Sequence, residues 1–211
     1  MNAITASSWP YPRWIAHRGA GKLAPENTLA AFRLGAQHGY RMFECDAKLS
    51  ADGVPFLLHD ATLERTTNGR GTGGDLPLGT LAQLDAGSWH SRAYAGEAVP
   101  TLEALARFCI ANGYFLNIEI KPTPGQEETT GRVVGETAAR LWQGQAVPPL
   151  FSSFKPDALA GAQATAAHIP RALLLDTLWD RCLDTARSLD CVAIVCNHAL
   201  WDAALVAQVK G

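Results

Sequence analysis

The sequence has no excess of basic residues and no apolar run long enough to span a membrane. Its 18 Lys and Arg residues face 20 Asp and Glu residues, which leaves a formal net charge of −2. No basic surplus is therefore available to neutralise phosphates, and we expect no nucleic-acid partner. Uncharged stretches such as residues 141–154 are broken by Gly, Gln or Pro and stay below the roughly 18 apolar residues of a membrane span. Residues 1–12 lack the apolar segment of a secretory signal, so we expect a cytoplasmic protein without membrane insertion.

Paired cysteines and nucleotide-binding glycine patterns are also missing. The five cysteines are odd in number and form no C-x-x-C pair, which argues against a disulfide framework and against a zinc finger. No G-x-G-x-x-G pattern follows the first apolar run, so dinucleotide binding has no support. The glycine-rich residues 69–74 lack the Lys-Ser/Thr pair of a phosphate-binding P-loop, and we expect a turn in a surface loop there.

What is present is a regular alternation of short apolar runs and segments with helical spacing. Hydrophobic residues make up 47% of the chain, enough to bury a core. The apolar runs predict strands at residues 14–16, 42–47, 114–120, 150–154, 172–175 and 191–196. A helix is predicted after each of them, and residues 54–59 are predicted to form a hairpin arm behind the Asp52-Gly53 turn. Six β-then-α units in a row indicate an α/β protein with a parallel sheet.

Two architectures satisfy this alternation: an open doubly wound sheet and a closed (β/α)8 TIM barrel. Residues 60–100 depart from the rhythm, because they carry seven glycines and little strand signal. Loops of this length in a compact domain are usually functional, and we interpret the segment as an insertion after His59 that lies over one end of a barrel. We expect residues 1–211 to form one domain.

Carboxylates alternate with apolar residues in two of the predicted strands. Glu44 and Asp46 are two residues apart, so their side chains point to the same face of the sheet. Asn117, Glu119 and Lys121 share one face of another strand in the same way. Ionised carboxylates on an inner face are costly to bury unless they are neutralised. A bound cation is the simplest solution, although a Glu119–Lys121 ion pair is an alternative for the second strand.

Two histidines add to this set. His17 and His59 stand at the ends of apolar runs, and in parallel α/β folds active sites lie at the carboxyl ends of strands. Three carboxylates offer oxygen ligands for Mg²⁺ or Ca²⁺. The histidines then stay available as acid and base, while Arg18 and Lys121 provide positive charge for an anion. A metal, two cations and an acid/base pair around an anion describe phosphodiester cleavage.

The motifs together resemble the glycerophosphodiester phosphodiesterase family over nearly the whole chain. The similarity is carried by IAHRG (15–19), PENT (25–28), E-x-D-x-KLS (44–50), LHD (58–60), L-x-RTTNG (63–69), EIKP (119–122) and SSF (152–154). Within this family, the chain resembles most closely the bacterial cytoplasmic members associated with glycerol-3-phosphate uptake. The resemblance implies a TIM barrel with an insertion after the second histidine.

The same resemblance implies the chemistry of the site. Glu44, Asp46 and Glu119 would bind a divalent metal, Mg²⁺ or Ca²⁺, while Arg18 and Lys121 would hold the phosphate. His17 and His59 would be the acid/base pair. The implied reaction converts small glycerophosphodiesters, such as glycerophosphocholine or glycerophosphoethanolamine, to sn-glycerol-3-phosphate and an alcohol through a cyclic phosphate.

Two other functions stay open at this point. A TIM-barrel glycoside hydrolase or lyase would use the paired carboxylates but leave both histidines idle, and it would work without metal. A non-catalytic module that only binds glycerophosphate is the third possibility. An eight-unit barrel typically needs about 250 residues. Since only six units are counted in 211 residues, we expect the last two βα units to be missing from this chain.

Overall fold

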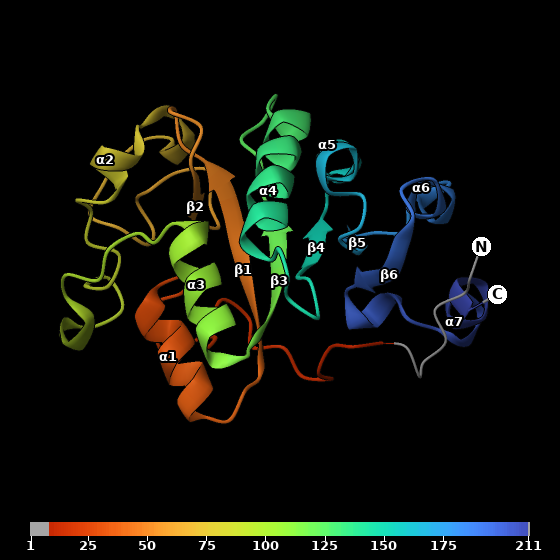
Figure 1. Cartoon of the computed structure of the whole chain (residues 1–211), viewed down its shortest axis with the longest axis horizontal. Helices are drawn as coiled ribbons and strands as arrows, with labels where there is room; N and C mark the ends of the chain where they lie inside the picture. The colour runs from red at the N-terminus through yellow and green to blue at the C-terminus, as the bar shows by residue number, and fades with distance from the viewer. Residues whose placement is uncertain (1–8, 211) are drawn as a thin grey trace.

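The computed structural model describes residues 9–210 and has an α/β fold with a mostly parallel sheet (Figure 1). The strands lie in the order β2-β1-β3-β4-β5-β6, and all neighbours are parallel except β1 and β2. The strand bounds are β1 Met42–Leu49, β2 Pro55–Leu57, β3 Phe115–Ile120, β4 Leu150–Ser153, β5 Arg171–Leu175 and β6 Cys191–Cys196. Five of the six strands predicted from the apolar runs are therefore present.

Three helices begin at residues that favour a helix N-terminus. Thr28 and Thr101 accept hydrogen bonds from backbone amides of the first turns of α1 and α3, which are the usual contacts of an N-cap. Pro156 begins α5, where its missing N–H costs no hydrogen bond. The bounds are α1 Leu29–Gln37, α2 Leu78–Leu81, α3 Leu102–Asn112, α4 Glu127–Leu141, α5 Pro156–Ala166, α6 Cys182–Ser188 and α7 Ala203–Lys210.

The two faces of the sheet have different chemistry. Odd-numbered residues of β1 and even-numbered residues of β3 pack against the helices, and α3 and α4 lie in front of these strands in Figure 1. The opposite face carries polar side chains along β1 and β3. Near the start of the strands this second face is covered by Tyr11, whose hydroxyl donates to the carbonyls of Pro148 and Pro149 at 3.1 Å. The open end of the face is therefore its carboxyl end.

The strand predicted at residues 14–16 is wrong. Only Ala16 pairs with β1, through a single parallel bridge to Phe43, while Trp14 and Ile15 are 70% and 39% exposed. The reason is that two segments share one edge of β1: Ala16 pairs near the start of this strand, and β2 pairs near its end. The described sheet thus has five parallel strands where the sequence predicts six.

The hairpin arm predicted at residues 54–59 is confirmed. Ala47 pairs with Leu57, and the amide of Leu58 donates to the carbonyl of Asp46 at 3.1 Å. The chain therefore returns along β1 and brings His59 back beside the carboxyl end of that strand. After it, the chain forms a small apolar cluster of its own, built from Phe56, Leu58, Leu63, Leu81, Ala86 and Val99.

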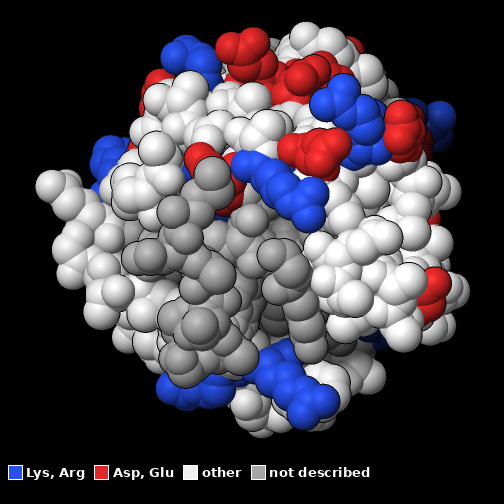
Figure 2. All heavy atoms as spheres, turned by 90° about the vertical axis from the view of Figure 1, so that its right-hand side faces the viewer, with Lys and Arg blue, Asp and Glu red and all other residues white. Residues whose placement is uncertain are grey.

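Within residues 9–210, β2 and β6 each have one neighbouring strand, so the described sheet does not close on itself. An eight-unit barrel with an insertion therefore stays a prediction. None of the described helices is long and apolar enough to cross a membrane. On the face shown in Figure 2, basic and acidic side chains lie close to one another.

Candidate active site

Three buried carboxylates lie together on the inner face of β1 and β3. Glu44, Asp46 and Glu119 are 7%, 0% and 8% exposed, and each offers an oxygen within 4.8 Å of the other two. The register explains the grouping, because Asp46 lies directly opposite Glu119 and Glu44 lies two residues before Asp46 on the same face. The cluster predicted from the two alternating motifs is thus present in the structure.

Burial and mutual repulsion disfavour the charged forms of two of these carboxylates. Burial, and then the charges of Asp46 and Glu119, raises the pKa of Glu44 well above its usual value. Burial and Asp46 likewise raise the pKa of Glu119. One oxygen each of Glu44 and Asp46, and the amide oxygen of Asn117, are buried without a hydrogen-bond partner. Such unsatisfied oxygen ligands fit a hard divalent cation such as Mg²⁺ or Ca²⁺.

Asp46 is held in position by the loop that follows Ala16. The Asn27 side-chain amide donates to Asp46 Oδ2 at 2.8 Å, and the Asp46 backbone amide donates to Asn27 Oδ1 at 3.1 Å. Arg18 Nε lies 3.2 Å from the same carboxylate oxygen. The Arg18 backbone amide donates to Glu44 Oε2 at 2.9 Å. Two of the three carboxylates are therefore oriented by one loop.

That loop follows an unusual backbone path. Arg18 and Asn27 have φ values of +52° and +60°, a region that side-chain-bearing residues seldom adopt. Gly19 has a φ of +100°, and a Cβ atom at this position would lie 2.7 Å from Ala31 Cβ. The glycine of the H-R-G motif thus lets the loop pass against α1, which places Arg18 at the cluster.

Gly19→Ala is expected to lower the free energy of unfolding by about 2 kcal/mol or more, because backbone strain and overpacking add at this position. Gly21→Ala is the matched control. Its φ is +59° but nothing lies within 4 Å of the added Cβ, so only the left-handed strain of about 1–2 kcal/mol applies. Urea unfolding of both variants checks this, and equal losses would contradict the close approach to α1.

Two lysines lie on the same face beyond the carboxylates. Lys121 Nζ is 3.1 Å from Glu119 Oε1 and 4.0 Å from Asp46 Oδ1, so the predicted Glu119–Lys121 ion pair is formed. Lys48 is 3% exposed and donates to the Lys121 carbonyl at 3.0 Å. Burial, and then the charge of Lys121, lowers the pKa of Lys48 to about 8. The site therefore contains a second lysine that the sequence analysis did not select.

His17 lies at the mouth of the cluster. Its Nε2 is 3.8 Å from Glu44 Oε2, and 64% of its side chain is exposed. Partial desolvation of the ring, and then the positive charge of Arg18, lowers the pKa of His17. The lowered pKa favours the neutral ring at neutral pH, which is the form that accepts a proton.

His59 is held by its neighbour in the sequence. His59 Nδ1 lies 2.6 Å from Asp60 Oδ1. A hydrogen bond from Arg65 keeps the pKa of Asp60 below its usual range, so Asp60 is an acceptor only. His59 must then donate through Nδ1, which leaves Nε2 as the atom available for proton transfer.

All seven predicted site residues thus lie around one end of β1 and β3. Four further residues belong to the site and were not predicted: Lys48, Asn27, Glu26 and Arg65. Lys48 could have been found, because it continues the alternation that begins at Glu44 and Asp46. The other three carry no periodic signal, but they stand in the PENT and L-x-RTTNG motifs that carry the family resemblance.

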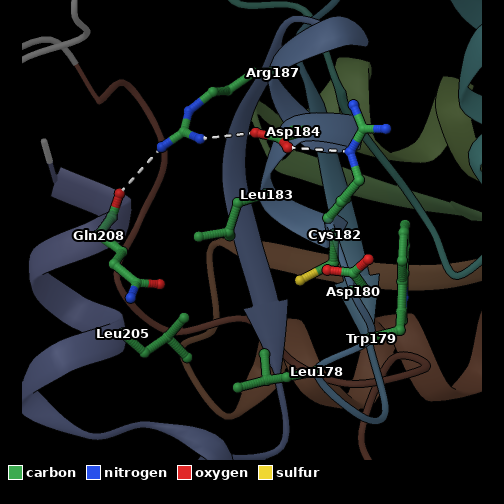
Figure 3. A pocket seen from close by; sticks show the side chains of 10 residues that line it. Leu178, Trp179, Asp180, Cys182, Leu183, Asp184, Arg187, Leu205 and Gln208 are labelled. Carbon is green, nitrogen blue, oxygen red and sulfur yellow. Dashed lines mark hydrogen bonds and ion pairs between the residues drawn. The ribbon is translucent and has the colours of Figure 1, made fainter.

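A separate hollow lies at the other edge of the sheet (Figure 3). It is lined by the segment before α6, by α6 itself and by α7, with Asp184 paired to Arg181 and Arg187. None of the predicted site residues lines it. The three-carboxylate cluster is therefore the better candidate for an active site.

Comparisons with known proteins agree with the motifs. The sequence pattern of the glycerophosphoryl diester phosphodiesterase family matches residues 17–211. A glycerophosphodiester phosphodiesterase of Caldanaerobacter subterraneus is 36% identical over 166 residues, covering 76% of this chain and 65% of the relative. One of Bacillus subtilis is 31% identical over 175 residues, covering 77% of this chain and 59% of the relative. The chain therefore spans less than two thirds of these relatives' length.

Solved structures agree as well. A phosphodiesterase from Oleispira antarctica, in complex with the product sn-glycerol-3-phosphate, is 37% identical with a TM-score of 0.87, covering 95% of this chain and 81% of that one. A glycerophosphodiester phosphodiesterase from Agrobacterium tumefaciens is 29% identical with a TM-score of 0.75, covering 93% and 80%. The fold, the site and the family match together identify the class: the chain belongs to the glycerophosphoryl diester phosphodiesterase family.

Proposed function

We propose that this protein hydrolyses small glycerophosphodiesters to sn-glycerol-3-phosphate and an alcohol with the help of a divalent metal. The observation that carries the proposal is the buried cluster of Glu44, Asp46 and Glu119, in which two carboxylate oxygens have no hydrogen-bond partner. Arg18 and Lys121 contact this cluster, and His17 lies at its mouth. The family match and the product bound to the Oleispira antarctica relative support the same substrate class.

The three carboxylates would hold Mg²⁺ or Ca²⁺, and the bound ion would act as a Lewis acid toward the phosphate. Arg18 and Lys121 would contribute positive charge to the phosphate oxygens, since both already lie against the carboxylates. We assign the substrate to the carboxyl end of β1 and β3, where active sites of (β/α)8 barrels lie. A barrel would bind a small-molecule substrate in this same region.

The histidines would move the protons in two steps. In the first, the glycerol hydroxyl next to the ester attacks phosphorus, His17 accepts the hydroxyl proton, and His59 gives a proton to the departing alkoxide. The new O–P bond closes a cyclic phosphate as the old one breaks. In the second, water opens the ring, His59 accepts the water proton and His17 returns its proton to the glycerol oxygen. The lowered pKa of His17 supports its role as the first base.

A coupled assay for glycerol-3-phosphate tests this proposal directly. We expect release from glycerophosphocholine or glycerophosphoethanolamine with Mg²⁺ or Ca²⁺, loss after chelation with EDTA, and recovery when the metal is added back. Full release of glycerol-3-phosphate in EDTA would contradict the part proposed for the metal, and no release from any diester would leave a glycoside hydrolase or lyase open. Binding of glycerol-3-phosphate without turnover of any diester would favour a non-catalytic module.

A further inference from the structure

Arg65 joins two acidic side chains that belong to different loops of the candidate site. Its Nε donates to Asp60 Oδ2 at 2.6 Å, and its Nη2 lies 3.0 Å from Asp60 Oδ1. Its Nη1 and Nη2 donate to the two oxygens of Glu26 at 2.8 Å each. Arg65 therefore uses the whole guanidinium fork to bridge the His59 loop and the Arg18 loop.

We propose that Arg65 is a positioning residue, which fixes the orientation of His59 through Asp60 and ties it to Arg18 through Glu26. The inference rests on the proposed function, because it assigns Arg65 a part in that reaction. Arg65 itself touches none of the three carboxylates of the cluster, so its effect must pass through its two acidic partners.

The contact with Asp60 decides how His59 can act. Arg65 supplies two hydrogen bonds to Asp60, and these keep it ionised and fixed in direction. Asp60 in turn holds His59 Nδ1 at 2.6 Å. Without Arg65 the Asp60 side chain could rotate, and the His59 ring would lose its anchor. A displacement of about 1 Å of a catalytic group can cost about 10²-fold in rate.

The contact with Glu26 extends the arrangement to the phosphate-binding side. Glu26 Oε1 also accepts from Arg18 Nη1 at 2.7 Å, so one carboxylate is shared by two arginines. Arg18 Nε then lies 3.2 Å from Asp46 Oδ2. Charges thus alternate from Asp60 through Arg65, Glu26 and Arg18 to Asp46, and the alternation links the His59 loop to the buried cluster.

If Arg65 only stabilised the fold, any loss of activity in its variants would be accompanied by a matching loss of stability. The Arg65 side chain is 44% exposed, and ion pairs at such positions contribute only about 0–1 kcal/mol to stability. Removing the side chain should therefore change the unfolding temperature little. A large loss of turnover without a matching loss of stability would show that the bridge acts on the reaction.

The variants are Arg65→Met, which removes the fork, and Arg65→Lys, which keeps the charge but cannot hold both oxygens of two carboxylates. Arg70→Met is the matched control, because Arg70 is an exposed arginine of the same segment. We expect Arg65→Met to lose about 10²-fold in kcat on glycerophosphocholine. Arg65→Lys should retain more activity than Arg65→Met, and Arg70→Met should equal the wild type.

A comparison of two leaving groups distinguishes an effect on His59 from a general disruption of the active site. In the first step, measured as single-turnover release of the alcohol, glycerophospho-p-nitrophenol needs little protonation of its leaving group. The Arg65→Met variant should therefore lose far less in this step with glycerophospho-p-nitrophenol than with glycerophosphocholine. In a His59→Ala background, Arg65→Met should add almost no further loss on glycerophosphocholine, because the residue it positions is already absent. KM should change less than kcat.

Equal losses on both leaving groups, or losses that add in the double variant, would overturn the inference. So would an Arg65→Met enzyme as active as the wild type. If Arg65→Met does not fold, the leaving-group comparison for Arg65→Lys decides alone. A wild-type protein that releases no glycerol-3-phosphate would refute the proposed function and the inference together, whereas an active wild type with unaffected Arg65 variants would refute only the inference.

Discussion

Glu44→Gln is expected to abolish diester hydrolysis and, at the same time, to make the metal-free protein more stable. Glu44 is buried, one of its oxygens has no hydrogen-bond partner, and its neighbours Asp46 and Glu119 are also acidic. Glutamine keeps the size of the side chain but removes the charge. The repulsion disappears, and with it one ligand of the proposed metal, so kcat should fall by about 10³-fold or more.

The sign of the pH dependence follows from the raised pKa. The pKa of Glu44 in the folded state lies above its ordinary value of 4.5, so the unfolded chain loses this proton first as the pH rises. The metal-free folded protein therefore loses stability from near that ordinary value up to the raised pKa. Glu119, whose pKa is also raised, acts in the same direction. Glu44→Gln should remove its own share of this decline.

A bound metal should offset this loss of stability in the wild type but not in Glu44→Gln. At 100 times its Kd, a bound ion adds about 2.7 kcal/mol to the free energy of unfolding, roughly 5–10 °C in Tm for a chain of this length. Thermal melts with EDTA, Mg²⁺ and Ca²⁺ between pH 5 and pH 8 would measure this. Glu136→Gln is the control, since Glu136 is an exposed residue paired with Arg132 on α4. A Glu44→Gln protein that keeps the full metal-induced shift would contradict the assignment.

The sequence predicted the carboxylate cluster because strand alternation is a strictly local rule. Glu44 and Asp46 share a face wherever β1 lies, and Glu119 joins them once β1 and β3 pair in parallel. His59 needed one more fact, the antiparallel return of β2, which the Asp52-Gly53 turn indicated. These residues were therefore predictable from period and turn chemistry alone.

The remaining parts depend on contacts between distant segments. The run at residues 14–16 looks like a strand by composition, but the β1 edge next to it is shared with β2, so a single bridge forms. Asn27 and Arg65 reach the site from irregular segments, and no spacing relates them to Asp46 or Asp60. Loop paths of this kind are set by tertiary packing, such as the close approach of Gly19 to α1. Periodicity therefore does not reveal Asn27 and Arg65, although both stand in motifs that carry the family resemblance.

His17→Ala and His59→Ala are expected to respond differently to the leaving group, and this difference is the second large effect. If His59 protonates the departing alkoxide, His59→Ala should lose about 10²–10⁴-fold on glycerophosphocholine. A p-nitrophenolate leaving group is stable without a proton, so most of the loss in the first step, the release of the alcohol, should disappear with glycerophospho-p-nitrophenol. His17 accepts the proton of the attacking hydroxyl, a task that the leaving group does not change.

His17→Ala should therefore be slow on both substrates. His38→Ala is the control, because His38 is an exposed histidine at the end of α1. Single-turnover rates of alcohol release for the three variants and two diesters test the assignment, because they report the first step before the ring opens. Rescue of His17→Ala by the activated leaving group, with none for His59→Ala, would exchange the two roles. In that case the lowered pKa of His17 would no longer point to the first base, and the Asp60 contact would serve to hold His59 as an acceptor.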